Sequence, residues 1–426
     1  MTPKGQSVSG VQWCLMMIGD STKKAYLEEN LGKTILPLSL LENETLIGSN
    51  PLEVLLFYKK DWTYEQFAEA FLKAAHHFNL FSSRLIRMDE DRYALHYCSD
   101  GVEINFLPPM DATSDSVNIE DIRKKIKKVK TLPGGPLLCL TGIAVKDGKF
   151  GGISCSHVIA DGFSLILFLH LWGCIIEGNE LPLPSPQRLF KGEPVKSEQI
   201  DPSFFPPLSD LNNEIQNRYQ STHARIYQKR EYFSDEFLRE HKQKAKSTHE
   251  KYEISDNQIM VSCLLKKYHR HILPDTDKVR LRHPVNLREI HPDIDPMYIG
   301  NAFFFSWTEF TKDEIDRLSI YEIAYRLKES IKSARDKNFI QDISYVSKYG
   351  IEFKPDMFNH YNATDMDTDI LSTNLAHMND LASLGIGPDK GRFLYVDLPI
   401  QNSFIMLKEK SGEVFAQITS RYPLPS

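Results

Sequence analysis

The sequence has few cysteines and no long apolar run. Its six cysteines are spread over 426 residues without a CxxC pair, so neither a disulfide framework nor a zinc site is indicated. No run approaches the ~20 apolar residues that a membrane span needs. The early stretch VQWCLMMIG has the size of a signal-peptide core, but no cleavage site follows it, and we interpret it as a strand. Together these features favour a reducing, cytoplasmic setting and no membrane span.

Patterns that would indicate other functional classes are missing as well. The 51 basic and 57 acidic residues leave a formal net charge of −6, which argues against nucleic acid as a partner. The histidines form no HExxH or similar motif, so we expect no metal site. GISCS, residues 152–156, ends in serine where the GxSxG motif of serine hydrolases needs glycine. The sequence also has no P-loop and no dinucleotide fingerprint.

A chain of this length is expected to form two domains, since single domains usually hold ~100–200 residues. The composition, 41% hydrophobic and 25% charged, is that of an ordinary soluble globular protein. Between Leu181 and Pro207 the chain is dense in proline and follows neither the helical nor the strand period. We therefore expect an N-terminal domain over 1–182, a crossover linker over 183–215 and a C-terminal domain over 216–426.

Both halves show the periodicities of an α/β fold. The stretch DWTYEQFAEAFLKAAHHF carries Thr63 and Gln66 at capping-box spacing, followed by an apolar stripe typical of a helix that packs on a sheet. Farther along, PLLCLTGIAVKDGKFGGISCS predicts two strands joined by a turn at Asp147 and Gly148. In the second half, charged helical stretches such as SDEFLREHKQKAKSTHEKYE alternate with apolar, strand-like runs such as GNAFFFSW and RFLYVDLPI.

The predicted hairpin leads directly into SHVIADGFS, which holds the candidate catalytic residues. If its second strand continues to His157, the period of two places Ile153, Cys155 and His157 on one face and points the histidine inward. Asp161 stands just before the apolar run FSLILFLHLW and is a favoured N-cap residue for a helix there. His157 itself has two interpretations: a partly buried structural histidine, or a base that takes a proton from an attacking hydroxyl or amine.

A family resemblance bears on this choice. HVIAD followed by Gly162 resembles the HxxxDG signature of the CoA-dependent acyltransferase superfamily, which includes BAHD acyltransferases, chloramphenicol acetyltransferase and peptide-synthetase condensation domains. LPLSLLEN, residues 36–43, is similar to the N-terminal LSxLD block of BAHD enzymes. VNLREIHPDIDPMYIGN, residues 285–301, resembles their block of an arginine, a proline-rich turn and a terminal Gly-Asn. The chain is thus identified as a divergent BAHD-type member.

Two positions depart from the family pattern. Condensation domains usually carry a second histidine before the catalytic one, where this chain has Ser156. The DFGWG motif of BAHD enzymes resembles SLGIG, residues 383–387, which keeps both glycines but not the aspartate. In the family that aspartate pairs with the arginine that corresponds to Arg288. Arg288 therefore needs another partner, for which nearby Asp380 is a candidate.

The resemblance implies two chloramphenicol-acetyltransferase-like domains, each a mixed sheet flanked by helices, with the active site in a channel between them. His157 would be the general base, and Asp161 would orient its loop while capping the helix. Acyl-CoA would be a co-substrate, with no permanently bound cofactor and no covalent acyl-enzyme. Structural roles would fall to five further residues, Gly162, Arg288, Asn301, Gly385 and Gly387.

Two further stretches are candidates for contacts with substrates or partners. LSTNLAHMN, residues 371–379, lies where family members place a residue near the reacting carbonyl, so Thr373 and Asn374 are either oxyanion donors or ordinary turn residues. IRKKIKKVK, residues 122–130, predicts an amphipathic helix with lysines on its outer face. Such a helix could dock an acidic acyl carrier protein, but more often it is a solvated surface.

The leading hypothesis is therefore an acyl-CoA-dependent O-acyltransferase, or N-acyltransferase, that acts on a small-molecule acceptor. A second hypothesis keeps this chemistry but takes the acyl group from an acyl carrier protein, as in polyketide or peptide biosynthesis. A third is a binding homologue without turnover, prompted by the missing side chains of the DFGWG motif. The intact His157, Asp161 and Gly162 argue against the third.

Overall fold

The computed structural model describes the parts of the chain that carry the sheets, their covering helices and the turn around His157. The described residues are 35–37, 51–59, 62–87, 93–97, 101–178, 227–248, 252–290, 294, 298–335, 367–376, 391–397, 402–408 and 412–425.

The chain folds into two compact units whose division does not follow the sequence order. Unit 1 combines Met1–Leu189 with two segments from the second half of the chain, and unit 2 holds the remainder. The two added segments are Ile294–Ala302 and Asp380–Pro399. The domains expected over 1–182 and 216–426 were each contiguous, whereas unit 1 takes these two segments from the second half of the chain. The expected linker lies outside the described residues.

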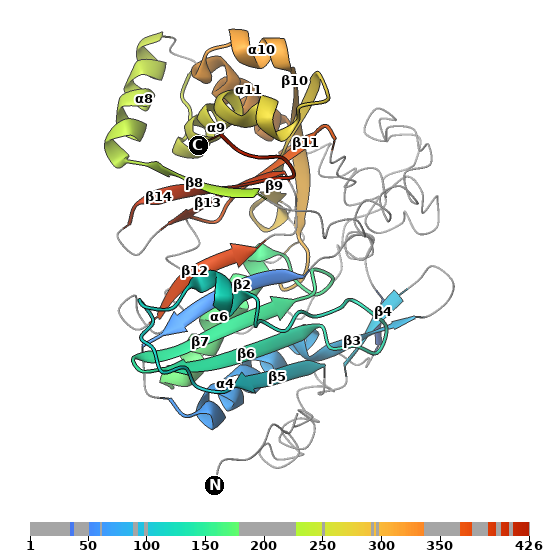
Figure 1. The fold of residues 1–426 in the computed structure, drawn as a ribbon. Helices are drawn as coiled ribbons and strands as arrows, with labels where there is room; N and C mark the ends of the chain where they lie inside the picture. Colours follow the sequence, from blue (N-terminus) through green and yellow to red (C-terminus); the bar gives the residue numbers. More distant parts are fainter. Residues whose placement is uncertain are drawn as a thin grey trace. The chain divides into compact units, whose positions relative to one another are not determined.

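Unit 1 is built on a mixed five-stranded sheet with the order β12-β2-β7-β6-β5 (Figure 1). β5 runs parallel to β6, and the other neighbours pair antiparallel. The strands are β2 (Leu52–Tyr58), β5 (Val102–Leu107), β6 (Leu138–Val145), β7 (Gly148–Cys155) and β12 (Gly391–Asp397). A smaller sheet joins β1 (Ile35–Pro37), β4 (Tyr93–Tyr97) and β3 (Ser83–Arg87). The helices are α4 (Tyr64–His77), the 3-10 helix η1 (Asn79–Ser82), α5 (Ile119–Arg123) and α6 (Gly162–Glu177).

Two local predictions are confirmed in unit 1. α4 begins with a capping box, in which Thr63 Oγ1 accepts the N–H of Gln66 at 3.2 Å and Gln66 Oε1 accepts the N–H of Thr63 at 3.0 Å. β6 and β7 pair antiparallel around the turn at Asp147 and Gly148. This hairpin brings the chain through the middle of the sheet and up to His157.

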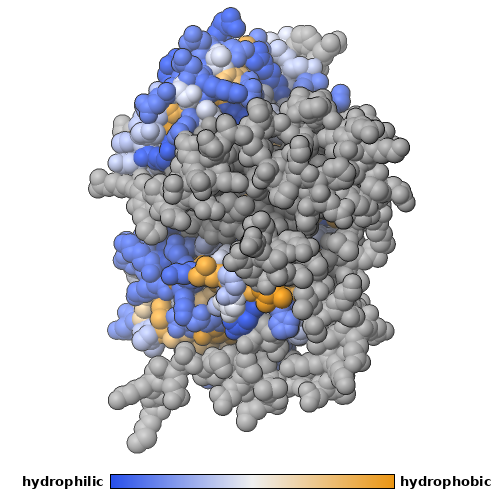
Figure 2. All heavy atoms as spheres, turned by 90° about the vertical axis from the view of Figure 1, so that its right-hand side faces the viewer, coloured by the Kyte–Doolittle hydropathy of each residue, from blue (hydrophilic) through white to orange (hydrophobic). Residues whose placement is uncertain are grey.

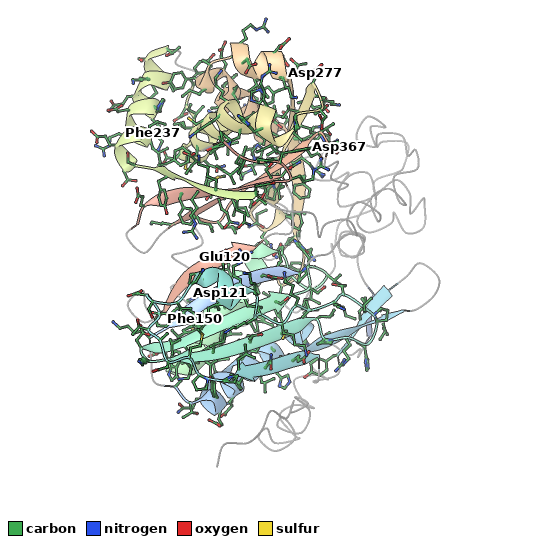
Figure 3. All side chains as sticks on the ribbon, viewed as in Figure 1. Glu120, Asp121, Phe150, Phe237, Asp277 and Asp367 are labelled. Atoms are coloured by element: carbon green, nitrogen blue, oxygen red, sulfur yellow. The ribbon has the colours of Figure 1, made fainter. Side chains whose placement is uncertain are left out.

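The two faces of the five-stranded sheet are covered differently. On one face α4 and α6 bury the larger apolar core of the unit. On the other face Ile122 and Ile126 pack against a smaller apolar cluster that includes Phe150. Figure 3 labels Phe150 together with Glu120 and Asp121 of α5. The face without the long helices is therefore covered by the chain that leaves α5.

That part of the chain is not the amphipathic helix expected over 122–130. α5 (Ile119–Arg123) is short, and after it residues 124–131 cross the sheet as an irregular segment, which we call the strap. The helix prediction is wrong for the strap, because its backbone bonds to the sheet.

Two backbone groups of the strap show this directly. The N–H of Lys127 donates to Thr141 Oγ1, and the N–H of Val129 donates to Ser154 Oγ, both at 3.0 Å. In a continuing helix these N–H groups would bond to carbonyl oxygens one turn earlier. Side chains of β6 and β7 satisfy them instead, so the strap needs no helical geometry.

Unit 2 is built on a mixed six-stranded sheet with the order β10-β9-β11-β13-β14-β8 (Figure 1). β11 runs parallel to both of its neighbours. The strands are β8 (Tyr227–Phe233), β9 (Lys278–Asn286), β10 (Phe303–Thr311), β11 (Asp369–Asn374), β13 (Ser403–Lys408) and β14 (Val414–Ser420). The helices are α8 (Asp235–Thr248), α9 (Asp256–Ile272), η5 (Leu287–Glu289), α10 (Lys312–Arg317) and α11 (Ile320–Ser333). The charged helices and apolar strands expected in the second half of the chain are confirmed, with the strand RFLYVDLPI forming β12 in unit 1.

The surface of the described residues is mainly hydrophilic on the face shown in Figure 2, with small hydrophobic patches. Among the described residues, the exposed large hydrophobic side chains are Leu132, 57% exposed, and Tyr232, 49% exposed. None of the helices given above is long and apolar enough to cross a bilayer.

Candidate active site

β7 ends at Cys155, and His157 lies in the turn that follows. The N–H of Ser156 donates to the carbonyl of Leu137 at 2.8 Å, and the N–H of Ile159 donates to the carbonyl of Ser156 at 3.2 Å. The second bond closes a turn, so β7 does not continue to His157, which was the condition for the inward orientation considered from the sequence. The His157 side chain is partly buried, and the three residues after it are fully buried.

Asp161 is the N-cap of α6, as the sequence predicted. Its Oδ1 accepts the N–H of Ser164 at 2.8 Å and so satisfies one of the first backbone donors of the helix. Its Oδ2 accepts the N–H of Ala302 at 3.0 Å. Because the two oxygens serve different partners, one carboxylate ties the start of α6 to a segment 141 residues later in the sequence.

Ser164 makes a second tie to the same segment. Its hydroxyl donates to the carbonyl of Gly300 at 2.8 Å and accepts the N–H of Gly300 at 3.0 Å. The N–H of Asp161 also donates to this carbonyl, at 3.4 Å. Sequence reasoning missed Ser164, because a serine in the first turn of a helix carries no chemical signature. Gly300 and Ala302 are thereby fastened to the HxxxDG turn and the start of α6.

Asn301, expected to be structural, contacts the imidazole of His157. Its Nδ2 donates to the carbonyls of His157 and Val158, at 2.7 and 3.3 Å. Its Oδ1 lies 3.0 Å from His157 Nδ1. Carbonyl oxygens only accept, so the two Nδ2 bonds fix which way the amide points. Oδ1 then requires a donor at Nδ1, and the neutral imidazole carries its proton on Nδ1 and its lone pair on Nε2.

The protonation of His157 follows from its surroundings. Burial lowers the pKa of His157, while its hydrogen bonds and the negative charge of Asp161 raise it to a smaller extent. The net shift is downward, so the ring is neutral at neutral pH and its Nε2 can accept a proton. Asp161 acts on the turn, since its carboxylate oxygens accept backbone N–H groups, while Asn301 orients the ring.

Two other predicted site residues are described. Gly162 is the first residue of α6. Arg288 is buried in η5, where its backbone N–H donates to Asn286 Oδ1 at 3.1 Å and its Nη1 to the same oxygen at 3.3 Å. The predicted structural residues Gly385 and Gly387, and the candidate partner Asp380, lie outside the described residues.

Thr373 and Asn374 end β11 in unit 2, and both are half-buried. Asn374 Oδ1 accepts the N–H of Ala376 at 2.9 Å, a local bond typical of a turn. Their contact with a substrate therefore stays a prediction. Within the described ranges, no three His, Cys, Asp or Glu side chains are grouped so that they could hold a metal ion.

An α/β fold with an oriented histidine in the turn before α6 is compatible with a transferase, although a fold alone does not define a function. Residues 28–372 match the Transferase family, and the chain belongs to this family. The BAHD-type identification made from the sequence is confirmed.

Known proteins are similar to this chain in sequence or in fold. An uncharacterised acetyltransferase of Arabidopsis thaliana is 25% identical over 264 residues, 55% of this chain and 56% of that protein. The match thus spans little more than half the length of that curated relative. F. sporotrichioides TRI101 complexed with coenzyme A and T-2 has a TM-score of 0.68 at 15% identity, over 91% of this chain and 95% of that one. Vinorine synthase has a TM-score of 0.62 at 17% identity, over 91% and 92%. The predicted α/β fold class is confirmed.

Proposed function

We propose that the protein transfers an acyl group from acyl-CoA to a hydroxyl, or an amine, of a small-molecule acceptor. The observation that carries the proposal is the pair of contacts between Asn301 and His157, which leaves the lone pair of a neutral imidazole on Nε2. A neutral, oriented imidazole is the ordinary general base for activating a hydroxyl near neutral pH.

The proposed reaction is a direct transfer. His157 Nε2 takes the proton of the acceptor as its oxygen or nitrogen attacks the thioester carbonyl. The tetrahedral intermediate collapses, the C–S bond breaks, and the leaving thiolate takes the proton from the imidazolium. The products are the acylated acceptor and free CoA, with no metal and no covalent acyl-enzyme. Thr373 and Asn374 are the candidates to stabilise the oxyanion, which needs a hydrogen-bond donor.

Acyl-CoA is the proposed donor because the relatives bind CoA. TRI101 has been solved with coenzyme A and T-2, and the F. graminearum protein with coenzyme A and deoxynivalenol. Both hold a CoA and a small organic molecule together, which fits a two-substrate transfer. The cytoplasmic location expected from the cysteine pattern is part of the same proposal.

The alternative donor, an acyl carrier protein, has less support. The expected docking surface was a helix with outward lysines, but the strap pairs Lys127 with Glu103 and Lys128 with Glu53 of the sheet. Lysines already paired within the chain are weaker attractors for an acidic partner. A non-catalytic homologue is disfavoured by the orientation of His157, since binding alone needs no fixed tautomer.

The proposal is tested by binding and turnover together. Isothermal titration with CoA should show binding that weakens with salt, because exposed charge pairs are screened over ~8–10 Å at physiological ionic strength. A screen of alcohols and amines with acetyl-CoA, followed by thiol release, should identify acceptors. If CoA does not bind at any ionic strength while an acylated carrier protein does, the donor assignment is wrong. If neither binds, the transferase proposal itself fails.

A further inference from the structure

The turn that holds His157 is supported from a second side, away from Asn301. Ser156, the residue directly before His157, is fully buried. Its Oγ lies 2.7 Å from the hydroxyl of Thr131, the last residue of the strap. The same Oγ accepts the N–H of Val158 at 3.4 Å. One hydroxyl thus contacts both the strap and the residue after His157.

The strap is itself fixed on the sheet, so Thr131 has a defined position. Ile126 lies over Gly152, where an added Cβ would be only 2.5 Å from Ile126 Cγ1, so only glycine leaves room there. Lys127 forms an ion pair with Glu103 of β5, and Lys128 pairs with Glu53 of β2 at 2.8 Å. With the backbone bonds to β6 and β7 described above, the strap is attached to four strands of the sheet.

The two supports of His157 act on different atoms. Asn301 contacts the imidazole and the carbonyls of His157 and Val158. The hydroxyl of Ser156 accepts the N–H of Val158 and, through Thr131, contacts the strap. The first fixes the direction and tautomer of the ring, and the second fixes the backbone from which the ring projects. A displacement of ~1 Å at a reacting group costs as much as ~10²-fold in rate, so both supports matter for catalysis.

We propose that Thr131 and Ser156 form a positioning pair for His157, through which the strap holds the catalytic turn in place. The inference rests on the proposed role of His157 as the base. The strap is then part of the active-site support, in place of the carrier-docking role considered for its lysines.

The test compares two substitutions that each remove one hydroxyl from the strap contacts. Thr131→Val breaks the bond to Ser156, while Thr141→Val removes the acceptor for Lys127 N–H at a distance from the turn. Both variants keep the side-chain shape, and thermal unfolding should show similar small losses of stability. Thiol release from acetyl-CoA, with an acceptor found by the screen above, should show kcat reduced ~10-fold for Thr131→Val, with both KM values within about 2-fold. Thr141→Val should lower kcat much less than Thr131→Val does, because the strap keeps its other anchors and its bond to Ser156.

Two further variants make the outcome specific. Thr131→Ser restores the hydroxyl and should recover most of kcat, and Ser156→Ala combined with Thr131→Val should be no slower than the slower single variant. Hydrogen exchange of the Val158 amide should be faster in Ser156→Ala than in wild type. The inference is overturned if Thr131→Val and Thr141→Val lose stability equally and both keep wild-type kcat. If His157→Ala still lowers turnover by ~10²–10⁴-fold in that case, the proposed function stands although the positioning role fails.

Discussion

The side-chain amide of Asn301 holds His157 at two points, with Nδ2 donating to the His157 carbonyl at 2.7 Å and Oδ1 facing its Nδ1 at 3.0 Å. The two residues are 144 positions apart in the sequence. One side chain therefore sets both the position of the turn that holds His157 and the tautomer of its imidazole. In many catalytic sites a carboxylate orients the histidine, and here an uncharged amide does so.

Because the side chain that contacts the His157 ring is uncharged, Asn301→Asp should change the pH dependence of kcat/KM. A carboxylate at Oδ1 would stabilise the imidazolium and raise the pKa of His157, and it would no longer donate to the two carbonyls. We expect the acidic limb of kcat/KM to move to higher pH and the plateau rate to fall. Asn301→Ala should lower kcat by ~10²-fold, because the ring loses its orientation. A pH profile of Asn301→Asp that superimposes on wild type would contradict the assigned contact.

The pH dependence of the wild-type enzyme follows from the lowered pKa of His157. The neutral form is the base, so kcat/KM should rise with pH and level off once His157 has lost its proton. Because the pKa is shifted downward, the midpoint should lie below the ordinary histidine value of about 6.5. The profile is measured by thiol release from acetyl-CoA under kcat/KM conditions. A midpoint clearly above that value would mean that the ring is charged in the resting enzyme.

Asp161→Ala should lower stability and rate together. The variant loses the cap of α6, worth ~1 kcal/mol, and the bond to Ala302 N–H that fastens the neighbouring segment. Asp161→Asn keeps an oxygen for one of the two backbone donors and should be milder in both respects. Urea unfolding and steady-state kinetics measure the two effects. A collapse in rate without any change in stability would show that the aspartate acts directly in the chemistry.

Gly152→Ala should displace the strap. The new Cβ would meet Ile126 in a packed layer, and such overpacking costs ~1–3 kcal/mol. Combining Gly152→Ala with Ile126→Ala removes the clash, so the double variant should be more stable than the sum of the two single losses implies. The double-mutant cycle is measured by chemical unfolding. Strictly additive losses would mean that Ile126 does not lie over Gly152.

The sequence was sufficient to predict those features that depend on residues close together along the chain. The capping box at Thr63 and Gln66, the hairpin turn at Asp147 and Gly148, and the cap at Asp161 are set by spacings of a few residues, and all three are confirmed. Such signals act through local hydrogen bonds, which the same short sequence forms in many settings.

The sequence was insufficient where distant segments decide the outcome. The strap has a helical apolar period, but side chains of β6 and β7 take its N–H groups, so the predicted helix ends early. The contact of Asn301 with His157 depends on where unit 1 places the segment Ile294–Ala302. No periodicity in the sequence predicts that contact, although the family resemblance implied a structural role for Asn301.

The most direct test of the proposed chemistry is the rate of thiol release from acetyl-CoA by His157→Ala, measured with a productive acceptor. The variant should fold with a wild-type melting profile and bind CoA with unchanged affinity, while turnover falls by ~10²–10⁴-fold, the usual contribution of a positioned general base. A folded, CoA-binding His157→Ala protein that transfers acyl groups at nearly the wild-type rate would contradict the assignment of His157 as the base.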